Sequence, residues 1–215
     1  MVSTRFQNAE RTGPAGIGAS ASTGFTICGW VNWHTAVYAP VVSLFPASGY
    51  PVAQLISIGN RVFLTDWSSG FDASADTWYF FVVTISSNTA TFRLSTDGET
   101  LGSGVTFAMG SGWALDHVSL GGYESDGDFL ADGQLHHVRA FADTLTDEEI
   151  LAELTSTSAT GSPWAAWELE DASLQDATAN DRDLTGSGGT ISVGTSSAPV
   201  IEKTDYNAIM MGSCF

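Results

Sequence analysis

Apolar and polar residues alternate with a period of two along much of the chain, which is the pattern of strands with one buried face. Residues 24–33 (GFTICGWVNW) are the clearest case, because Phe25, Ile27 and Val31 share one face. Similar segments follow, and turn residues separate them. The further predicted strands include QLISI, RVFLTDW, WYFFVVTIS, ATFRLST, HVSLGG, QLHHVRAF, AAWELE and GTISVG. About a dozen such strands predict an all-β fold, a two-sheet antiparallel sandwich.

Two connections have the residues of tight hairpin turns. Gly59-Asn60 separates QLISI from RVFLTDW, and both residues tolerate positive φ. Residues 87–89 (Ser-Asn-Thr) separate WYFFVVTIS from ATFRLST. We therefore predict two β-hairpins.

One segment has the pattern of a helix. In LTDEEILAEL (145–154), Thr146 is a natural N-cap and Glu149 stands at the position that completes a capping box. Leu145 and Ile150 are placed to form a hydrophobic staple around it. Acids in the first turn suit the helix dipole. The sequence predicts one short helix over residues 147–154.

The length of 215 residues suits one sandwich domain. Residues 1–23 form an N-terminal segment in which we expect the first edge strand, and 24–201 form the domain. Although TSTSATGSP (155–163) resembles a linker, 164–201 contains only two convincing strands and no core of its own. We therefore expect these strands to return to the same sandwich. Residues 202–215 are expected to be a tail.

The charge narrows the choice of partners. The chain has 24 acidic and 7 basic residues and a net charge of −17, which disfavours nucleic acids and anionic membrane surfaces. Its apolar runs are shorter than the roughly 20 residues of a membrane helix, so no membrane insertion is expected. The N-terminus lacks the apolar stretch of a signal peptide. Cys28 and Cys214 are too few for a disulfide framework, and their redox state is not predicted.

The order of these segments resembles the laminin G-like, concanavalin A-like jelly-roll family. The resemblance rests on an aromatic-Thr-x-x-x-Trp-Val strand, a Trp-Tyr hairpin with an Asp-Gly turn, a strand leading into a Leu-Thr-x-x-Glu-Ile helix, and a Trp-x-Leu segment. In this sequence they are FTICGWVNW, TWYFFVVTISSNTATFRLSTDGE, VSLGGYESDGDFLADGQLHHVRAFADTLTDEEILAEL and AWELEDASLQDATANDRDLTGSGGTISVG. The resemblance implies a jelly-roll β-sandwich with one short helix.

His136 and His137 stand where the family more often has Asp and Glu. Adjacent side chains on a strand point to opposite faces, so the two imidazoles cannot converge on one ion without a bulge. We therefore expect these histidines to be structural.

Acidic loop residues are the first candidates for a site. In YESDGDFLADG (123–133), Asp126, Asp128 and Asp132 offer hard oxygen ligands around a glycine turn, which suits calcium. The alternative is that they are solvated turn acids. A second acidic group around Asp176 is better explained by Asx-turns.

Aromatic residues near strand ends are the second candidates. Trp33, Trp67 and Tyr123 could stack on the apolar face of a sugar ring, since binding sites combine such surfaces with a few polar groups. The alternative is that each of them caps the core.

A glycosidase would need two carboxylates facing one cleft. WELEDAS (167–173) places Glu168 and Glu170 on one strand face, but no third acid follows at the spacing of the concanavalin-like enzymes. The sequence also has no Gly-x-Ser-x-Gly, HExxH or phosphate-loop motif. We therefore predict that the protein is not an enzyme, with a glycoside-active enzyme as the less favoured alternative.

These observations predict a non-catalytic binding or surface-display module that recognises glycans. The alternative is a structural subunit, such as a decoration or fibre protein of a phage virion or another extracellular assembly. The expected partners are a glycan or other protein subunits, including copies of the same chain. The expected location is extracellular or on a virion surface.

Overall fold

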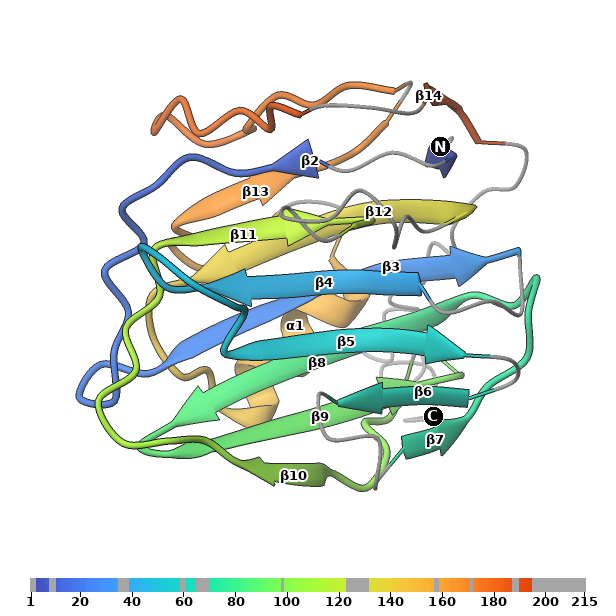
Figure 1. Cartoon of the computed structure of the whole chain (residues 1–215). Coiled ribbons are helices and arrows are strands. Elements are labelled where there is room, and N and C mark those ends of the chain that lie inside the picture. Colours follow the sequence, from blue (N-terminus) through green and yellow to red (C-terminus); the bar gives the residue numbers. More distant parts are fainter. Residues whose placement is uncertain are drawn as a thin grey trace, which may run out of the picture.

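The structure is a computed structural model of the whole chain (Figure 1). It describes residues 3–7, 11–34, 39–58, 61–64, 70–97, 99–122, 132–156, 159–170, 172–186 and 190–194. Within these residues the chain forms fourteen strands and one helix. None of the described helical structure is long and apolar enough to cross a membrane.

The first sheet has eight strands. Seven of them follow the order β10-β9-β8-β3-β12-β1-β14, and β13 also pairs with β12. The bounds are β1 Thr4–Gln7, β3 Phe25–Trp33, β8 Tyr79–Ser86, β9 Thr89–Ser95, β10 Val105–Ala108, β12 Asp132–Phe141, β13 Ala165–Trp167 and β14 Thr190–Val193.

The second sheet has six strands in the order β2-β11-β4-β5-β6-β7. The bounds are β2 Arg11–Thr12, β4 Ala39–Phe45, β5 Ala53–Ile58, β6 Arg61–Leu64, β7 Gly70–Asp72 and β11 His117–Leu120. Every recorded pairing in both sheets is antiparallel. The predicted two-sheet antiparallel sandwich is confirmed.

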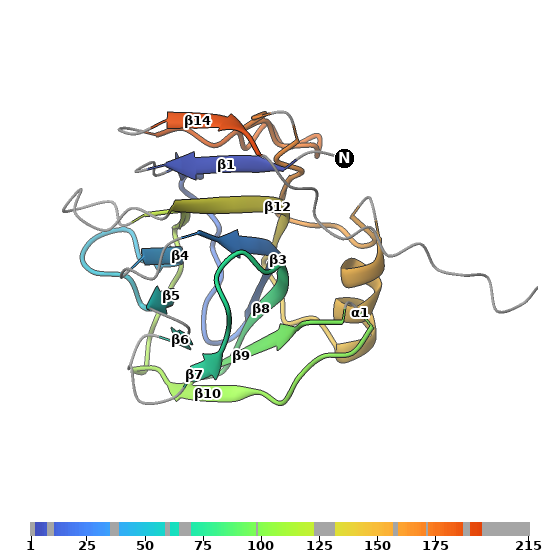
Figure 2. The ribbon, with the colours of Figure 1, turned by 90° about the vertical axis from the view of Figure 1, so that its right-hand side faces the viewer.

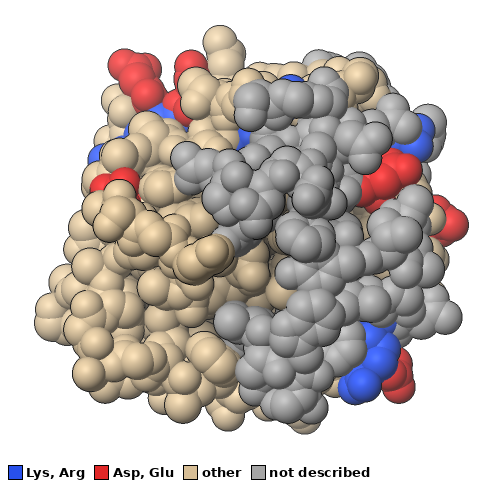
Figure 3. All heavy atoms as spheres, in the orientation of Figure 1, with Lys and Arg blue, Asp and Glu red and all other residues tan. Residues whose placement is uncertain are grey.

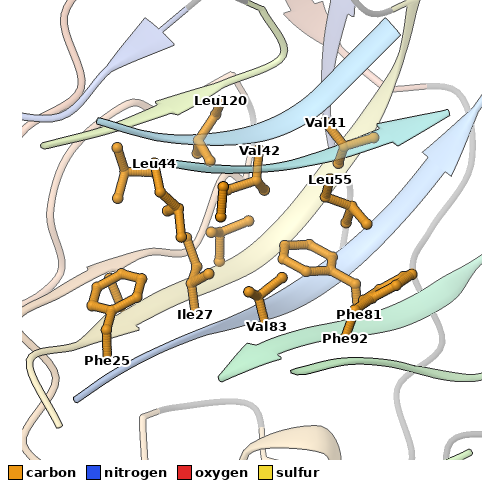
Figure 4. Close-up of a cluster of buried hydrophobic side chains, with 14 of the residues drawn as sticks. Phe25, Ile27, Val41, Val42, Leu44, Leu55, Phe81, Val83, Phe92 and Leu120 are labelled. Atoms are coloured by element: carbon orange, nitrogen blue, oxygen red, sulfur yellow. The ribbon is translucent and has the colours of Figure 1, made fainter. Parts of the chain in front are cut away.

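The two sheets face each other, and the helix α1 (Asp147–Thr155) lies on the outer side of the eight-stranded sheet (Figure 2). Apolar side chains from both sheets fill the space between them (Figure 4). The labelled members of this core are Phe25, Ile27, Val41, Val42, Leu44, Leu55, Phe81, Val83, Phe92 and Leu120. Since β3 places Phe25 and Ile27 between the sheets, its alternate residues Cys28 and Trp30 pack outward in a second, smaller cluster beneath α1.

The helix begins as the sequence predicts. Thr146 Oγ1 accepts a hydrogen bond from the Glu149 backbone amide, and the Glu149 carboxylate accepts one from the Thr146 amide at 2.8 Å. Leu145 and Ile150 both pack in the cluster beneath the helix, in agreement with the predicted staple. The helix ends at Thr155, one residue beyond the prediction.

Both predicted hairpins are present. Ile58 pairs with Arg61, so two residues connect β5 to β6. Ser86 pairs with Thr89, so the second turn is Ser87-Asn88 and is one residue shorter than predicted. Ser87 has a φ of 55°, the left-handed conformation that such a tight turn requires.

The last described strands return to the sandwich. β13 pairs with the second half of β12, and β14 pairs with β1. The N-terminal segment contributes to both sheets, because β2 forms an edge of the six-stranded sheet while β1 lies between β12 and β14. The expected first edge strand is therefore β2, and β1 is an interior strand because β14 covers its outer side. The predicted tail 202–215 lies outside the described residues.

The turn after β13 is organised by a carboxylate, as the Asx-turn interpretation predicts. Asp176 accepts hydrogen bonds from the backbone amides of Ala166, Thr178 and Arg182 at 2.9–3.1 Å. Burial alone would raise the pKa of Asp176, but these hydrogen bonds lower it below its usual value. The carboxylate therefore has a structural role in holding this segment against β13.

Candidate functional site

The predicted calcium ligands are only partly described. Asp132 is the first residue of β12, and its Oδ1 lies 3.4 Å from Arg5 Nη2. Asp126 and Asp128 lie outside the described residues. The calcium site therefore stays a prediction, and Asp132 has an ion-pair partner on β1.

The expectation that Trp33 offers its ring to a sugar is not met. Trp33 is 2% exposed, and its ring stacks on Tyr79 with the centroids 5.2 Å apart. The reason is its place at the end of β3, where the alternation turns it toward the space between the sheets. Trp67 and Tyr123 lie outside the described residues.

A groove opens where the β4–β5 connection (46–52) meets the β10–β11 connection (109–116). It has a volume of about 560 Å³. One wall comes from the six-stranded sheet and the other from the segment that crosses between the sheets. The lining residues are Pro46, Ala47, Ser48, Val52, Phe107, Met109, Gly110, Ser111, Gly112, Trp113 and Ala114. We refer to this hollow as the end groove.

Backbone hydrogen bonds hold both walls of the end groove in place. The Val52 amide donates to the Leu44 carbonyl at 2.8 Å and closes the β4–β5 connection. On the other wall, the Met109 amide donates to Asn88 O at 2.7 Å, and Trp113 Nε1 donates to Ser87 O at 2.6 Å. The β8–β9 turn therefore anchors the wall that carries the aromatic residue, so the groove is formed before any ligand binds.

None of the described residues that line the end groove is charged, although the chain has a net charge of −17. In Figure 3, the lower-left part of the described surface shows neither acidic nor basic side chains. The floor of the groove is apolar, since Met109 and Trp113 are buried and Phe107 is half-buried, while Ser48 and Ser111 on the rim are exposed. An apolar floor with a few hydroxyl and backbone groups suits a neutral, amphipathic ligand.

Tyr50 lies in the β4–β5 connection and is the one large hydrophobic side chain recorded as exposed among the described residues, at 78%. Trp113 comes from the other wall and lines the groove, whereas Tyr50 is not among the lining residues. Phe107 and Met109 were missed. Their only signal is a short strand, VTFA, that leads into Met-Gly-Ser-Gly.

A second polar region lies on the outer face of the eight-stranded sheet, at a β-bulge in β12. His136 pairs with Trp30 and Arg139 pairs with Cys28, so two residues of β12 stand opposite Gly29. A Cβ on Gly29 would lie 2.9 Å from the Cα of Val138, so only glycine leaves room here.

A bulge is the condition under which the two imidazoles could converge, and β12 has one at these histidines. His137 has a φ of 48°, and the imidazoles of His136 and His137 stack with their centroids 3.7 Å apart instead of pointing to opposite faces. Adjacent residues alternate only in a regular strand, so the structural role expected for the two histidines stays a prediction. The bulge lies where the neighbour of β12 changes from β1 to β13.

Carboxylates surround the pair of imidazoles. His137 Nε2 lies 3.0 Å from Glu168 Oε2 and 3.8 Å from Glu170 Oε1. Both acids follow β13, with Leu169 between them in the left-handed conformation at φ 54°. They approach the same histidine but do not lie on a strand, because β13 ends at Trp167.

A buried ion pair completes this region, which we call the bulge cluster. Arg139 Nη1 donates to Glu153 Oε2 at 2.6 Å, and the side chain of each is 1% exposed. Arg139 Nη2 also lies 3.5 Å from Glu168 Oε2. The pair links β12 to α1, and the bulge cluster consists of His136, His137, Arg139, Glu153, Glu168 and Glu170.

Burial sets the charge states of the bulge cluster. It lowers the pKa of His136 to about 4 and that of His137 to about 3, and the Arg139 charge acts in the same direction. Burial raises the pKa of the Glu168 carboxyl, while Arg139 opposes that shift. Both imidazoles are therefore neutral at neutral pH.

The chain was compared with known proteins. A comparison with curated protein sequences finds no match. A candidate carbohydrate-binding protein of Bacteroides ovatus shares the fold, with a TM-score of 0.64 and 13% identity over 93% of this chain. The chain spans 62% of the length of that protein.

Two further solved structures are similar. A heptameric SAP-like pentraxin of Limulus polyphemus has a TM-score of 0.59 and 10% identity, covering 90% of this chain and 95% of the pentraxin. A mutant sialidase of Trypanosoma rangeli that displays trans-sialidase activity has a TM-score of 0.51 and 17% identity, covering 63% of this chain and 23% of the sialidase. At these identities the likeness shows the fold.

The family is shown by the sequence itself. A family model described as the concanavalin A-like lectin/glucanases superfamily matches residues 11–151, which is more than half of the chain. The match runs from β2 into α1 and so includes the β12 bulge and the end groove. The chain belongs to the concanavalin A-like lectin/glucanase superfamily.

Proposed function

We propose that this protein is a non-catalytic carbohydrate-binding module that holds a neutral glycan in the end groove. The observation that carries the proposal is an uncharged, apolar-floored groove of about 560 Å³, lined by described residues, on a chain with a net charge of −17. The lectin-like fold and the similar carbohydrate-binding protein support it.

The chemistry of the end groove matches that of a sugar. Pyranose rings have an apolar face that packs on aromatic and aliphatic side chains, and hydroxyl groups that pair with backbone and serine groups. Phe107 would supply the apolar contact in the groove, Tyr50 is an exposed aromatic residue of the adjoining connection that could extend it, and Ser48 and Ser111 are placed to pair with hydroxyls. The negative field of the protein would repel an anionic glycan, so a neutral one is favoured.

We place recognition and not cleavage at this groove because none of its described lining residues carries a carboxylate. In the part of the chain that the structure describes, the two acids nearest to a glycosidase pattern, Glu168 and Glu170, belong to the bulge cluster and approach His137. A hydrolase would need a pair of carboxylates facing its substrate.

The test is a screen on an array of neutral and sialylated glycans, followed by calorimetric titration of the best ligand. A blocking variant, Gly110→Phe, is expected to weaken binding at least tenfold, because a side chain at Gly110 enters open space and the backbone there is not left-handed. Tyr50→Ala is expected to weaken binding severalfold without a change in melting temperature. The matched control is Thr96→Phe, at an exposed position after β9.

Two outcomes would overturn the proposal. One is a flat response across the array together with a stable high-order assembly by light scattering, which would favour a structural subunit. The other is binding that Gly110→Phe and Tyr50→Ala both leave unchanged. An extracellular or virion-surface location is part of the proposal, because glycans are displayed there.

A further inference from the structure

The bulge cluster brings nitrogen and oxygen ligands together from two segments. One ligand atom each from His136, His137 and Glu170 lies within 4.8 Å of the other two. The histidines come from the β12 bulge, and the glutamate follows β13. This arrangement depends on the bulge, because a regular strand would turn one imidazole into the core.

The ring nitrogens of His136 are buried, and the packing around them does not explain why. The residue is 1% exposed, and neither ring nitrogen makes a hydrogen bond of normal geometry with the described residues. The Glu168 carbonyl, which accepts a hydrogen bond from the His137 amide, is also close enough to one His136 ring nitrogen to oppose the lowering of its pKa, so the other nitrogen is the one left without a partner among the described residues. A buried polar group without a partner costs about 1–3 kcal/mol of stability, so such groups are rare in folded proteins. A neutral imidazole with an unshared lone pair, held 3.7 Å from a second imidazole, is well placed to receive a metal ion.

The charges of the bulge cluster also favour a cation. The three carboxylates of Glu153, Glu168 and Glu170 stand against one guanidinium, that of Arg139. The described cluster therefore has more carboxylates than guanidinium groups, and a divalent cation would offset that excess.

We propose that His136, His137 and Glu170 form a binding site for a divalent transition-metal ion, with Zn²⁺ as the best representative. Two imidazoles and a carboxylate are ligands of intermediate softness, which suits Zn²⁺ better than Ca²⁺. The site is separate from the end groove, since none of its ligands lines that groove, and its ligands differ from the predicted calcium ligands Asp126, Asp128 and Asp132.

The two imidazoles stack at an interplanar angle of 23°, so the rings and the Glu170 side chain would have to turn for their ligand atoms to converge on one ion. Ligand atoms in a tetrahedral zinc site lie about 3.4 Å apart for bonds of about 2.1 Å. The Glu170 side chain is 40% exposed, so it can turn toward the imidazoles, and it gives the ion a route from solvent. Glu168 Oε2, 3.0 Å from His137 Nε2, is the nearest candidate for a fourth ligand.

The bound ion would connect the β12 bulge to the segment after β13. In the described structure the backbone amide of His137 already donates to the Glu168 carbonyl at 3.0 Å. A metal bridge at the same place would reinforce the point where β12 changes its neighbour from β1 to β13. The expected effect is therefore greater stability of the folded state.

The test uses the full chain without a histidine tag, after treatment with a chelator. Calorimetric titration with ZnCl₂ is expected to show one site per chain, and Zn²⁺ is expected to raise the melting temperature. CoCl₂ is expected to give the visible absorption bands of a low-symmetry cobalt site. Calcium at the same ionic strength should not displace either ion.

Two variants test the proposed ligands, and a third serves as the control. His136→Phe keeps the ring in its buried place but removes the nitrogens, and Glu170→Gln removes the carboxylate charge at a half-exposed position. Each is expected to weaken Zn²⁺ binding at least 100-fold while the metal-free protein stays folded. The matched control is His117→Gln on β11, which removes a histidine from the other sheet and should bind Zn²⁺ normally.

Three results would overturn the proposal. They are the absence of saturable Zn²⁺ binding to the chelator-treated chain, full Zn²⁺ affinity in His136→Phe, or loss of affinity in His117→Gln. Since His136→Phe keeps an aromatic ring in the stack, a folded variant that still binds the ion would show that the site lies elsewhere.

Discussion

The two faces of the eight-stranded sheet differ in chemistry although the same strands make both. The inner face carries apolar side chains such as Phe81 and Val138, which pack against the six-stranded sheet. The outer face places Phe80 and Cys28 beneath α1, beside the buried charges of Arg139 and Glu153. The inner face therefore holds the two sheets together, whereas the outer face carries the buried charged and polar side chains.

The first prediction compares two neighbouring residues of β8. Phe81, fully buried between the sheets, and Phe80, 1% exposed beneath the helix, differ mainly in which face they occupy. Phe81→Ala is expected to lower the free energy of unfolding by about 4 kcal/mol, because the space between two sheets cannot collapse. Phe80→Ala should cost less, since a single helix can shift to fill the gap. Urea denaturation of both variants measures this, and equal losses would contradict the distinction.

The second prediction concerns the buried ion pair. Glu153→Gln leaves Arg139 charged and buried with only the half-exposed Glu168 nearby, so a loss of about 3 kcal/mol is expected. In Arg139→Met/Glu153→Gln the unpaired charge is gone and most of this stability should return. Denaturant unfolding of the single and double variants measures the difference. If the double variant is as unstable as Glu153→Gln, the loss of stability does not come from an unpaired charge on Arg139.

The third prediction is a dependence on pH in the metal-free protein. The folded-state pKa values of His136 and His137, about 4 and about 3, lie below the ordinary value near 6.5. Below pH 6.5 the unfolded chain therefore binds more protons than the folded one, and stability falls as the pH falls. Between pH 6.5 and 5.5 the expected loss is about 2 kcal/mol, from two groups at up to about 1.4 kcal/mol per pH unit each.

The matched control for this pH dependence is His136→Phe/His137→Asn, which removes both imidazoles and keeps a residue that tolerates positive φ at position 137. Its stability should change less over the same interval in the presence of chelator. A slope as steep as that of the original protein would assign the effect to other groups.

The smallest expected effect is at the N-terminus of α1, the helix that covers the outer face. Thr146→Ala removes the N-cap and should cost about 1 kcal/mol, because the Glu149 amide loses its acceptor. Thr146→Ser keeps the hydroxyl and should be nearly neutral. Thermal unfolding of both variants distinguishes them, and a loss of the same size in Thr146→Ser would assign the effect to packing instead of capping.

Much of the fold could be predicted because it depends on local signals. The period of two in β3, the turn at Ser87-Asn88 and the capping box of Thr146 and Glu149 are each contained in a few adjacent residues. The period of two in the strands predicts which side chains face the core of the sandwich.

The candidate sites depend on tertiary contacts, so the sequence could not locate them. The bulge at His136–His137 arises where β12 exchanges β1 for β13, a change that involves segments far apart in the chain. The end groove joins residues 46–52 to residues 107–114, and neither segment carries a recognisable motif. Trp33 is a candidate because it ends its strand, but its register turns it inward.

The place of β1 between β12 and β14 has a consequence for the order in which the chain is made. Ser3 bonds to Gln134, a partner 131 residues away, and its carbonyl accepts from the Gly194 amide at 2.7 Å. During synthesis, when N-terminal residues emerge first, this strand must wait for both neighbours before its backbone groups can pair. β1 is therefore made before both of its neighbours and joins its sheet late, and residues 3 and 194, nearly two hundred positions apart in the chain, finish side by side.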